Sequence, residues 1–248
     1  MPQAPYFLKS TQKSGFESYW KDRMARRACT ENETPLLHRS PSRLQLETFA
    51  QAIQPQWLEI GAGSGTFFSD LSKVYPDTHF VAIERARFRA LRLQARQKKH
   101  RENPNFHPLR GNALTLFYAF SQPVWDRVFI LYHCPWPKRK HQKNRWHYHP
   151  GLSALIATMK HNSALIIASD ASWYIDEAHY VFSHFFEFHQ REASCPFTLH
   201  IEASGPLSPN AWNEGNRFPQ GRTHFEKTFL AEGKSCYELV VRKKSCPI

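Results

Sequence analysis

A glycine-rich turn between a strand and a helix constrains the fold of this chain more than any other feature. Residues 58–66 read Leu-Glu-Ile-Gly-Ala-Gly-Ser-Gly-Thr, after a short apolar strand and before an amphipathic helix, Phe67 to Tyr75. Glycine suits this turn because the chain must bend tightly and let a ligand approach the backbone. A second apolar strand ends in Glu84, at about the distance from the glycines that one βαβ unit requires. An acidic side chain there can bind the hydroxyls of a ribose, so the pattern predicts a nucleoside-containing cofactor.

The spacing of the glycines separates two classes of cofactor. The dinucleotide fingerprint is G-x-G-x-x-G, whose turn and following helix receive a pyrophosphate, which an NAD-dependent dehydrogenase would need. Here the spacing is G-x-G-x-G, and Glu59 lies just before the first glycine. A carboxylate there would repel a diphosphate, whereas it suits S-adenosylmethionine, which carries an amino group and a sulfonium and no phosphate. The pattern resembles the first two motifs of the Rossmann-like methyltransferases, and a glycine turn without a ligand is the alternative.

Strands and helices alternate along the chain, which predicts an α/β fold with a mostly parallel sheet and helices on both faces. With the resemblance, this indicates a Rossmann-like class I methyltransferase fold with an antiparallel C-terminal strand. We expect strands over 57–60, 79–83, 106–109, 127–132, 164–168, 197–201 and 237–242. We expect helices over 66–75, 86–100, 150–160 and 172–190, with a short helix between the last two strands. In such sheets ligands bind at the carboxyl ends of the strands.

The chain divides into two parts. Residues 1–50 are polar, basic and interrupted by prolines, and we expect them to form an N-terminal extension with a helix leading into the first strand from Arg43 to Ala52. Residues 51–248 form the S-adenosylmethionine-dependent methyltransferase domain in this prediction, and 248 residues suffice for both parts. The formal net charge of +12 favours a polyanionic partner.

The sequence also predicts where the protein works. No apolar run reaches membrane-spanning length, and Met1 to Gly15 lack the apolar segment of a secretory signal. The five cysteines are scattered without a C-x-x-C pair, which predicts reduced thiols and no metal site. We therefore expect a cytoplasmic protein without a membrane partner, and either a monomer or a homodimer.

A rigid aromatic turn followed by dense basic charge comes after the strand that ends near Leu131. It reads Tyr-His-Cys-Pro-Trp-Pro-Lys over 132–138, and Lys and Arg dominate the stretch to Arg145. The prolines restrict the backbone, Trp136 offers a flat face for stacking a base, and the basic run can follow a phosphate backbone. A core tryptophan beside a solvated basic helix explains the same residues equally well.

Four motifs in order resemble the bacterial tRNA (guanine-N7-)-methyltransferases of the TrmB type, over about residues 56–243. The 132–138 segment is similar to the family's F-P-D-P-W-P-K, and Glu59 to Gly65 match its E-I-G-x-G-x-G. Ala168-Ser169-Asp170 with Tyr174 matches A-T-D-x-x-x-Y. Thr223 to Glu226, followed by Gly233, resemble T-x-F-E-x-x-x-x-x-x-G.

The resemblance implies transfer of a methyl group from S-adenosylmethionine to N7 of a guanosine in tRNA, usually position 46 of the variable loop. The cofactor-binding positions that it implies are Glu59, Gly61, Gly63, Gly65, Glu84, Asn112 and Cys134. The substrate-binding positions that it implies are Lys138, Asp170, Thr223, His224, Phe225 and Glu226. By their charge, Arg139, Lys140, Lys143 and Arg145 would extend the contact to phosphates. The basic helix from Arg85 to Lys99 either adds to this footprint or is a solvated face.

Cys134 departs from the family, because it stands at the position of the catalytic aspartate. N7 of guanine has a lone pair, so catalysis depends on in-line positioning and on stabilising the positive charge that develops on the purine. A thiol, which is mostly neutral at pH 7, stabilises that charge less than a carboxylate does. Cys134 is therefore either a substitute at the catalytic position or a small buried filler.

Three functions follow from these alternatives. We expect a working tRNA methyltransferase, because the other motif residues are present. A catalytically weakened relative that binds tRNA and S-adenosylmethionine without efficient turnover is the alternative. A small-molecule methyltransferase would share the glycine turn and Glu84 but would not need the basic run from Lys138 to Arg145.

Overall fold

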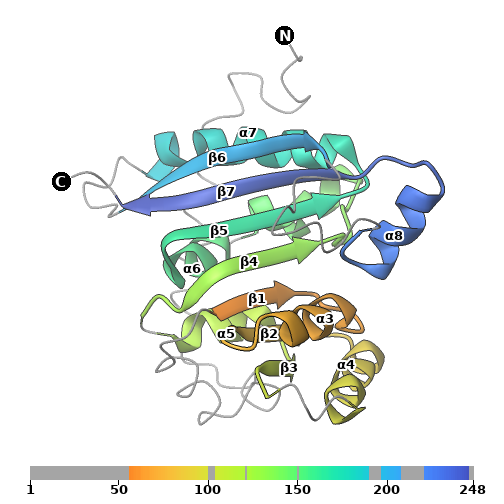
Figure 1. The fold of residues 1–248 in the computed structure, drawn as a ribbon. Coiled ribbons are helices and arrows are strands. Elements are labelled where there is room, and N and C mark those ends of the chain that lie inside the picture. The colour runs from red at the N-terminus through yellow and green to blue at the C-terminus, as the bar shows by residue number, and fades with distance from the viewer. Residues whose placement is uncertain are drawn as a thin grey trace.

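The computed structural model describes residues 56–99, 104–120, 122–149, 151–189, 197–207 and 221–245. These residues form a seven-stranded sheet in the order β3-β2-β1-β4-β5-β7-β6 (Figure 1). The strands are β1 (Gln56–Ile60), β2 (His79–Glu84), β3 (Phe106–Arg110), β4 (Trp125–Leu131), β5 (Met159–Ser169), β6 (Phe197–Pro206) and β7 (Tyr237–Ser245).

The first five strands are parallel, and β7 runs antiparallel to both of its neighbours, β5 and β6. Strand β1 pairs with β2 on one side and with β4 on the other, so the strand order reverses at β1. Such a reversal opens a crevice at the carboxyl ends of the strands, where open α/β sheets bind ligands. The predicted fold, a mostly parallel Rossmann-like sheet with an antiparallel C-terminal strand, is confirmed.

Helices cover both faces of the sheet. They are α3 (Thr66–Val74), α4 (Arg87–Lys99), α5 (Ala113–Ala119), α6 (Gly151–Ala157), α7 (Ser172–His189) and α8 (His224–Ala231), with 3-10 turns η3 (Arg139–Asn144) and η4 (Trp146–Tyr148). Helices α5, α6 and α7 contribute to one hydrophobic cluster, and α3 and α4 contribute to the other. The sheet is therefore the middle layer of three.

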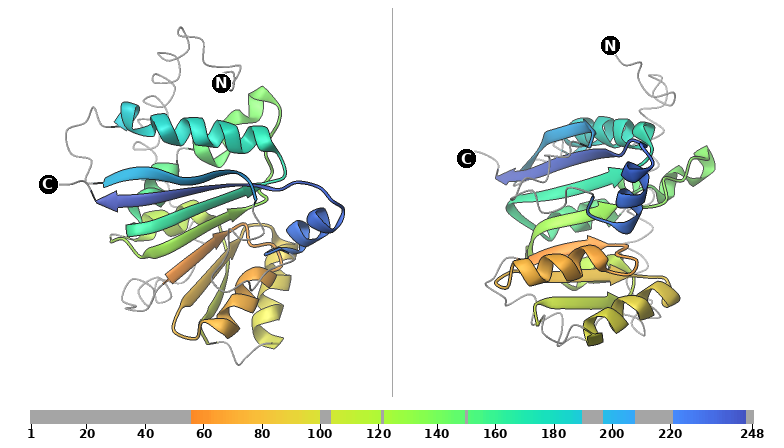
Figure 2. Two further views of the ribbon diagram at one scale, coloured as in Figure 1. Left: turned by 45° about the horizontal axis from the view of Figure 1, so that its top comes forward. Right: turned by 45° about the vertical axis from the view of Figure 1, so that its right-hand side comes forward.

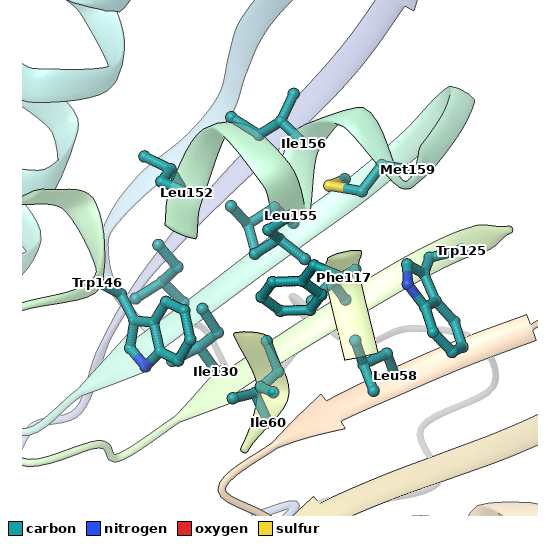
Figure 3. Packing of buried hydrophobic residues seen from close by; sticks show 14 of the residues in the cluster. Leu58, Ile60, Phe117, Trp125, Ile130, Trp146, Leu152, Leu155, Ile156 and Met159 are labelled. Atoms are coloured by element: carbon teal, nitrogen blue, oxygen red, sulfur yellow. The ribbon is translucent and has the colours of Figure 1, made fainter. Parts of the chain in front are cut away.

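Successive side chains of the central strands belong alternately to these two clusters. In β4, Val128 and Ile130 belong to the cluster under α5 to α7, whereas Phe129 and Leu131 belong to the cluster under α3 and α4. Figure 3 shows the first cluster, in which Ile130 lies beneath Phe117 and the residues of α6. Both faces are buried, which explains why the central strands appear in the sequence as continuous apolar runs.

Several segments that carry sequence motifs lie at one end of the sheet. Helix α8 lies beyond the carboxyl ends of β4 and β5, and α4 lies at the same end of the molecule (Figures 1 and 2). Helix α4 begins three residues after β2 ends, and η3 and η4 follow the loop after β4. This end of the sheet is where the sequence motifs were expected to meet.

Several expected boundaries are wrong. Strands β6 and β7 run to Pro206 and Ser245, past the expected ends at 201 and 242. The helix expected over 150–160 is α6, which ends at Ala157, and β5 begins at Met159 instead of 164. The early part of β5 contains exposed His161 and Asn162, so its apolar pattern begins only at its buried half. Helix α5 was not expected at all, because the apolar run Ala113 to Ala119 lacks a helical alternation of apolar and polar residues.

The expected N-terminal extension and its helix over 43–52 lie outside the described residues. Within the residues that the structure describes, no helix is long and apolar enough to cross a membrane.

Candidate active site

The glycine turn after β1 is built from backbone contacts to β2. The amides of Gly61 and Ala62 both donate to the carbonyl oxygen of Ile83, at 2.8 and 3.1 Å. Gly65 has a left-handed φ of 70°, and a Cβ atom there would lie 2.1 Å from Cδ1 of Leu93 in α4. A larger residue would therefore push α4 away from the turn. A Cβ atom at Gly63 would meet no atom within 4 Å, so the backbone is open to a ligand at that point.

Glu84, the last residue of β2, contacts the glycine turn. Its side chain is buried, and its two oxygens accept hydrogen bonds from the amides of Gly63 (3.0 Å) and Ala86 (2.7 Å). Arg89 Nε lies 3.5 Å from Oε2 of the same carboxylate. The structure thus brings Glu84 directly to the glycine turn, which is the arrangement that the sequence predicted for a ribose-binding carboxylate.

Glu59, on β1, is the least compensated group at this site. It is 4% exposed, and among the described residues its Oε2 has no hydrogen-bond partner. The pKa of its carboxyl is raised to about 8, mainly by burial and also by the nearby charge of Glu84, while Arg222 opposes the shift. A buried carboxyl oxygen without a partner is costly unless a ligand compensates it. An ammonium group would do so, and the site therefore fits a cationic cofactor.

Asn112, predicted to bind the cofactor, lies at the carboxyl end of β3. Its Oδ1 accepts a hydrogen bond from the amide of Leu114 at 3.2 Å and caps α5. The amide of the preceding Gly111 donates to the carbonyl of Glu84 at 3.2 Å. Asn112 therefore caps a helix next to the segment that contacts Glu84, and its contact with a cofactor stays a prediction.

The loop after β4, residues 132–136, is bounded by two residues with left-handed backbones, and we call it the Cys134 loop. Tyr132 has a φ of 51° and Trp136 a φ of 50°, a conformation that bulky side chains rarely adopt. Such backbone conformations persist only where the surrounding structure enforces them. Cys134 lies between the two residues and is exposed as a free thiol. The interpretation of Cys134 as a small buried filler is therefore wrong.

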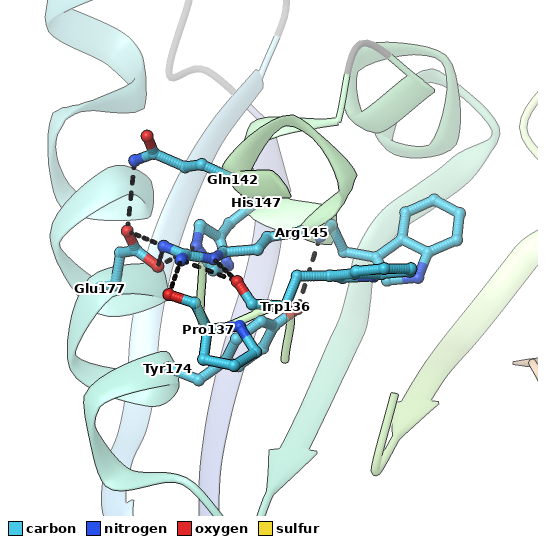
Figure 4. A network of polar contacts seen from close by, with 8 residues as sticks. Trp136, Pro137, Gln142, Arg145, His147, Tyr174 and Glu177 are labelled. Carbon is cyan, nitrogen blue, oxygen red and sulfur yellow. Dashed lines mark hydrogen bonds and ion pairs between the residues drawn. The ribbon is translucent and has the colours of Figure 1, made fainter. Parts of the chain in front are cut away.

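A buried ion pair holds the Trp136 end of this loop. Nε and Nη2 of Arg145 donate to the carbonyl oxygen of Trp136 at 3.1 and 2.9 Å. Nη1 of Arg145 contacts both carboxylate oxygens of Glu177, on α7, at 2.6 Å each (Figure 4). Glu177 also lies 3.0 Å from Nε2 of the buried His147. Arg145 is buried and paired, so the expectation that it contacts phosphates is wrong.

A second buried network holds the Tyr132 end. The hydroxyl of Tyr132 donates to Oε1 of Glu226 at 2.5 Å, and the Tyr132 amide donates to the carbonyl of Ala168 at 2.8 Å. Nη2 of Arg222 contacts Glu226 at 2.7 Å, while its Nη1 pairs with Glu238 on β7. Burial alone would raise the pKa of Glu226, but the charge and hydrogen bonds of Arg222 hold it below its usual value.

These contacts change the role expected for the T-x-F-E segment. Thr223 caps α8 by accepting a hydrogen bond from the Glu226 amide at 3.1 Å, and Glu226 has no exposed surface. Its burial contradicts the predicted direct contact of Glu226 with substrate and gives it a role in positioning the loop. Phe225 is exposed and lies against Tyr132, with a distance of 4.8 Å between the ring centroids.

The remaining predicted substrate-binding residues are exposed at the same end of the sheet. Lys138, Arg139, Lys140 and Lys143 lie on or next to η3, Asp170 follows β5, and His224 begins α8. Among the residues that the structure describes, no group of three or more His, Cys, Asp and Glu side chains could hold a metal ion.

Sequence reasoning assigned no role to His133. A Cβ atom on Gly61 would lie 3.9 Å from its Nδ1, so the imidazole faces the glycine turn. Burial lowers the pKa of His133, although Glu84 opposes this shift. Sequence reasoning assigned no role to Arg222 either, and its burial and its pairs with two glutamates show what it does.

Residues 53–202 match the family described as "Putative methyltransferase". The chain belongs to this family. A similar curated relative is the tRNA (guanine-N(7)-)-methyltransferase of Lacticaseibacillus casei (strain BL23), which is 28% identical over 196 residues, covering 79% of this chain and 84% of the relative. The resemblance predicted from the four motifs is confirmed.

Solved structures support the fold. The antibiotic-resistance methyltransferase Kmr is 16% identical with a TM-score of 0.53, covering 84% of this chain and 95% of Kmr. The W203A mutant of the 16S rRNA (adenine(1408)-N(1))-methyltransferase from Catenulisporales acidiphilia, solved with cosubstrate SAM, is 13% identical with a TM-score of 0.50. The match covers 84% of this chain and 94% of the rRNA methyltransferase chain. At these identities the likeness shows the class I methyltransferase fold alone.

Proposed function

We propose that this protein transfers a methyl group from S-adenosylmethionine to N7 of a guanosine in tRNA. The observation that carries the proposal is the convergence of four separate segments at the carboxyl end of the sheet. The glycine turn, Glu84, the Cys134 loop and the T-x-F-E segment meet there through contacts between their residues. The relative from Lacticaseibacillus casei supports the substrate, because its name gives the same reaction.

The residues on the cofactor side fit the three polar parts of S-adenosylmethionine. Glu59 has a free buried oxygen for the amino group, Glu84 lies where the ribose hydroxyls are bound, and the open backbone at Gly63 admits the ligand. The bound cofactor would supply an electrophilic methyl group on a positively charged sulfur. The carboxyl of Glu59 also disfavours a phosphate-containing cofactor, because a phosphate cannot compensate the charged form of this carboxyl as an ammonium group can.

The protein then has to hold a guanine with its N7 in line with that methyl group. The N7 lone pair forms the new N–C bond, the S–C bond breaks with its electrons going to sulfur, and the purine becomes positively charged. No base is needed to remove a proton first, so positioning dominates. The exposed Phe225 and the Cys134 loop, which is fixed at both ends, are available for this task, and exposed Asp170 offers a negative charge to the purine.

The basic residues around η3 suit the phosphates of the same RNA. Lys138, Arg139, Lys140 and Lys143 are exposed next to the loop that carries Cys134. Phosphate contacts of this kind fix the orientation of a nucleic acid without reading its sequence. We propose position 46 of the variable loop as the site of modification, on the family resemblance, and a cytoplasmic location, where tRNA is available.

Analysis of nucleosides by mass spectrometry tests this function. Unmodified tRNA is incubated with the protein and S-adenosylmethionine, digested, and examined for 7-methylguanosine. We expect 7-methylguanosine with the wild-type protein and a loss of at least about 100-fold with Glu84→Ala, since the carboxylate fixes both the turn and the ribose site. Replacing G46 of the tRNA should abolish the product.

The exposed Cys134 favours one alternative, a relative that binds tRNA and cofactor without efficient turnover. If S-adenosylhomocysteine and tRNA both bind the protein and no 7-methylguanosine forms, this alternative replaces the proposed reaction. If methyl transfer occurs to a small molecule and tRNA does not bind, the substrate class itself is wrong.

A further inference from the structure

Helix α4 presents an apolar and basic surface that the reaction described above does not use. Phe88 is 82% exposed and Leu91 is 49% exposed, which makes Phe88 the most exposed of the large hydrophobic side chains that the structure describes. Exposed Arg92 and Ala95 share this face, because positions 88, 91, 92 and 95 are three or four residues apart. We call these four residues the outer face of α4.

The opposite side of α4 fixes the helix firmly to the cofactor-binding turn. Ala90 and Leu93 are fully buried, and Leu93 packs against Gly65. Nε of Arg96 donates to the carbonyl oxygen of Ser64 at 3.0 Å. The outer face therefore points away from this attachment, and no packing among the described residues accounts for its exposed phenyl ring.

The charge on α4 favours a polyanion as the partner of this face. The sequence has no Asp or Glu from Arg85 to Arg101, whereas Arg85, Arg87, Arg89 and Arg92 are all exposed. Arg87 and Arg89 lie in the first turn, where the helix dipole makes positive charge unfavourable. The ion pair of Arg89 with Glu84 accounts for one of these two arginines, and phosphate binding is a reason for the other, Arg87.

We infer that the outer face of α4 is a second RNA-binding surface, on which Phe88 stacks with an unpaired base while the neighbouring arginines bind the flanking phosphates. Exposed aromatic rings among basic side chains bind single-stranded nucleotides in this manner. The inference rests on the proposed function, since it takes tRNA as the substrate. Helix α4 and helix α8 lie at the same end of the molecule, so an RNA held at the Cys134 loop can extend to α4 (Figure 1).

Two substitutions with matched controls test the surface. Phe88→Ala removes the stacking ring, and its control is Val74→Ala, which truncates an apolar side chain that is 41% exposed at the C-terminal end of α3. Arg92→Gln removes one positive charge, and its control is Lys244→Gln, which removes an exposed charge near the end of β7. All four side chains are at least partly in solvent, so the variants should fold. Unchanged stabilisation by S-adenosylhomocysteine in thermal unfolding checks this.

Affinity for unmodified tRNA is measured by fluorescence anisotropy over a range of salt concentrations. We expect Phe88→Ala to weaken binding about 5- to 100-fold, from the usual contribution of one stacked base. Arg92→Gln should weaken binding and reduce the slope of log K against log salt by about 1. Both controls should bind as the wild-type protein does.

The outcomes separate this inference from the proposed function. If the wild-type protein binds and methylates tRNA while both α4 variants behave like their controls, the inference is overturned and the function stands. If Phe88→Ala instead changes self-association or binding to anionic vesicles without affecting tRNA affinity, the face binds protein or membrane and the inference is also overturned. Failure of the wild-type protein to bind tRNA overturns both.

Discussion

Glu59 shows what a single buried carboxyl group contributes to this site. It lies on a central strand, among the described residues its Oε2 has no hydrogen-bond partner, and its pKa is raised to about 8 by burial and by the neighbouring Glu84. A group in this state is neutral at pH 7 in the absence of a ligand. It becomes charged when a cation approaches, so binding of the proposed cofactor would be linked to proton release at this residue.

The raised pKa of Glu59 makes stability depend on pH in a defined direction. A carboxyl group whose pKa is higher in the folded protein stabilises the fold fully below its unfolded value near 4.5, and this contribution is lost as the pH rises to about 8. The loss is about 1.4 kcal/mol per pH unit in that range, or about 3 kcal/mol between pH 6 and pH 9. Urea unfolding at both pH values should show this decrease for the wild-type protein and a smaller one for Glu59→Gln.

Other groups titrate in the same range, so the difference between the two proteins is the informative quantity. Saturating S-adenosylhomocysteine should reduce the difference in pH dependence between wild type and Glu59→Gln, because the ligand's amino group compensates the charged carboxylate. Equal pH dependence for wild type and Glu59→Gln would mean that Glu59 is ionised throughout.

The contribution of Cys134 to methyl transfer can also be tested by a single substitution. It is exposed between two residues with left-handed backbones, at the position where the resemblance implies an aspartate. We expect Cys134→Asp to leave methyl transfer unchanged or to raise it up to about tenfold, because a carboxylate stabilises the charge that develops on the purine. Single-turnover transfer of a labelled methyl group to tRNA measures this. Loss of activity would show instead that the thiol has a chemical role of its own.

At the scale of elements, the Cys134 loop is held by two helices that are distant in sequence. Helix α7 holds its end at Trp136 through Arg145 and Glu177, and α8 holds its beginning through Glu226 and Tyr132. Neither ion pair is exposed, so neither exchanges partners readily with water. The loop conformation is therefore a property of how these helices pack on the sheet.

Glu177→Gln tests this arrangement. The amide keeps the shape of the side chain but leaves the buried Arg145 charge unpaired, which should cost about 3 kcal/mol in the free energy of unfolding. We expect kcat for tRNA methylation to fall at least about tenfold while affinity for S-adenosylhomocysteine changes little, since Trp136 loses its fixed position. Asp176→Asn is the matched control, because Asp176 is the exposed neighbour on the same helix. An equal loss of affinity and kcat would argue for general unfolding.

At the scale of the whole molecule, positive charge is the dominant feature. The sequence has 33 Lys and Arg residues against 21 Asp and Glu residues. Several exposed Lys and Arg side chains lie around η3, next to the Cys134 loop. Long-range attraction of this kind speeds the approach of a polyanion and weakens as salt screens it.

Removing two charges at η3 should therefore change the salt dependence of tRNA binding. For Lys140→Gln with Lys143→Gln, we expect weaker binding and a slope of log K against log salt that is smaller by about 2. The control removes the same number of charges from exposed positions elsewhere, as Lys73→Gln with Lys244→Gln. Filter-binding assays at several salt concentrations measure both. Identical slopes for the two double variants would exclude a specific phosphate contact at η3.

The sequence was sufficient to predict that the glycine turn and Glu84 lie together, and it was insufficient to predict how the Cys134 loop is held. Glu59, the glycines and Glu84 belong to one βαβ unit, whose local pattern determines their positions. The partner of Arg145 is 32 residues away and that of Tyr132 is 94 residues away, so only the folded packing shows that these charges are buried. Basic residues next to a loop look alike in sequence, whether they contact RNA or an internal carboxylate.

Strand β7 also has a consequence for the order in which the protein becomes active during synthesis. It lies between β5 and β6, although it is the last of the described strands to leave the ribosome, and its Glu238 pairs with the Arg222 that holds Glu226. A nascent chain can complete the glycine turn long before this strand arrives. The Cys134 loop is locked only afterwards, so under the proposed function a chain interrupted before β7 would be able to bind the methyl donor and unable to use it.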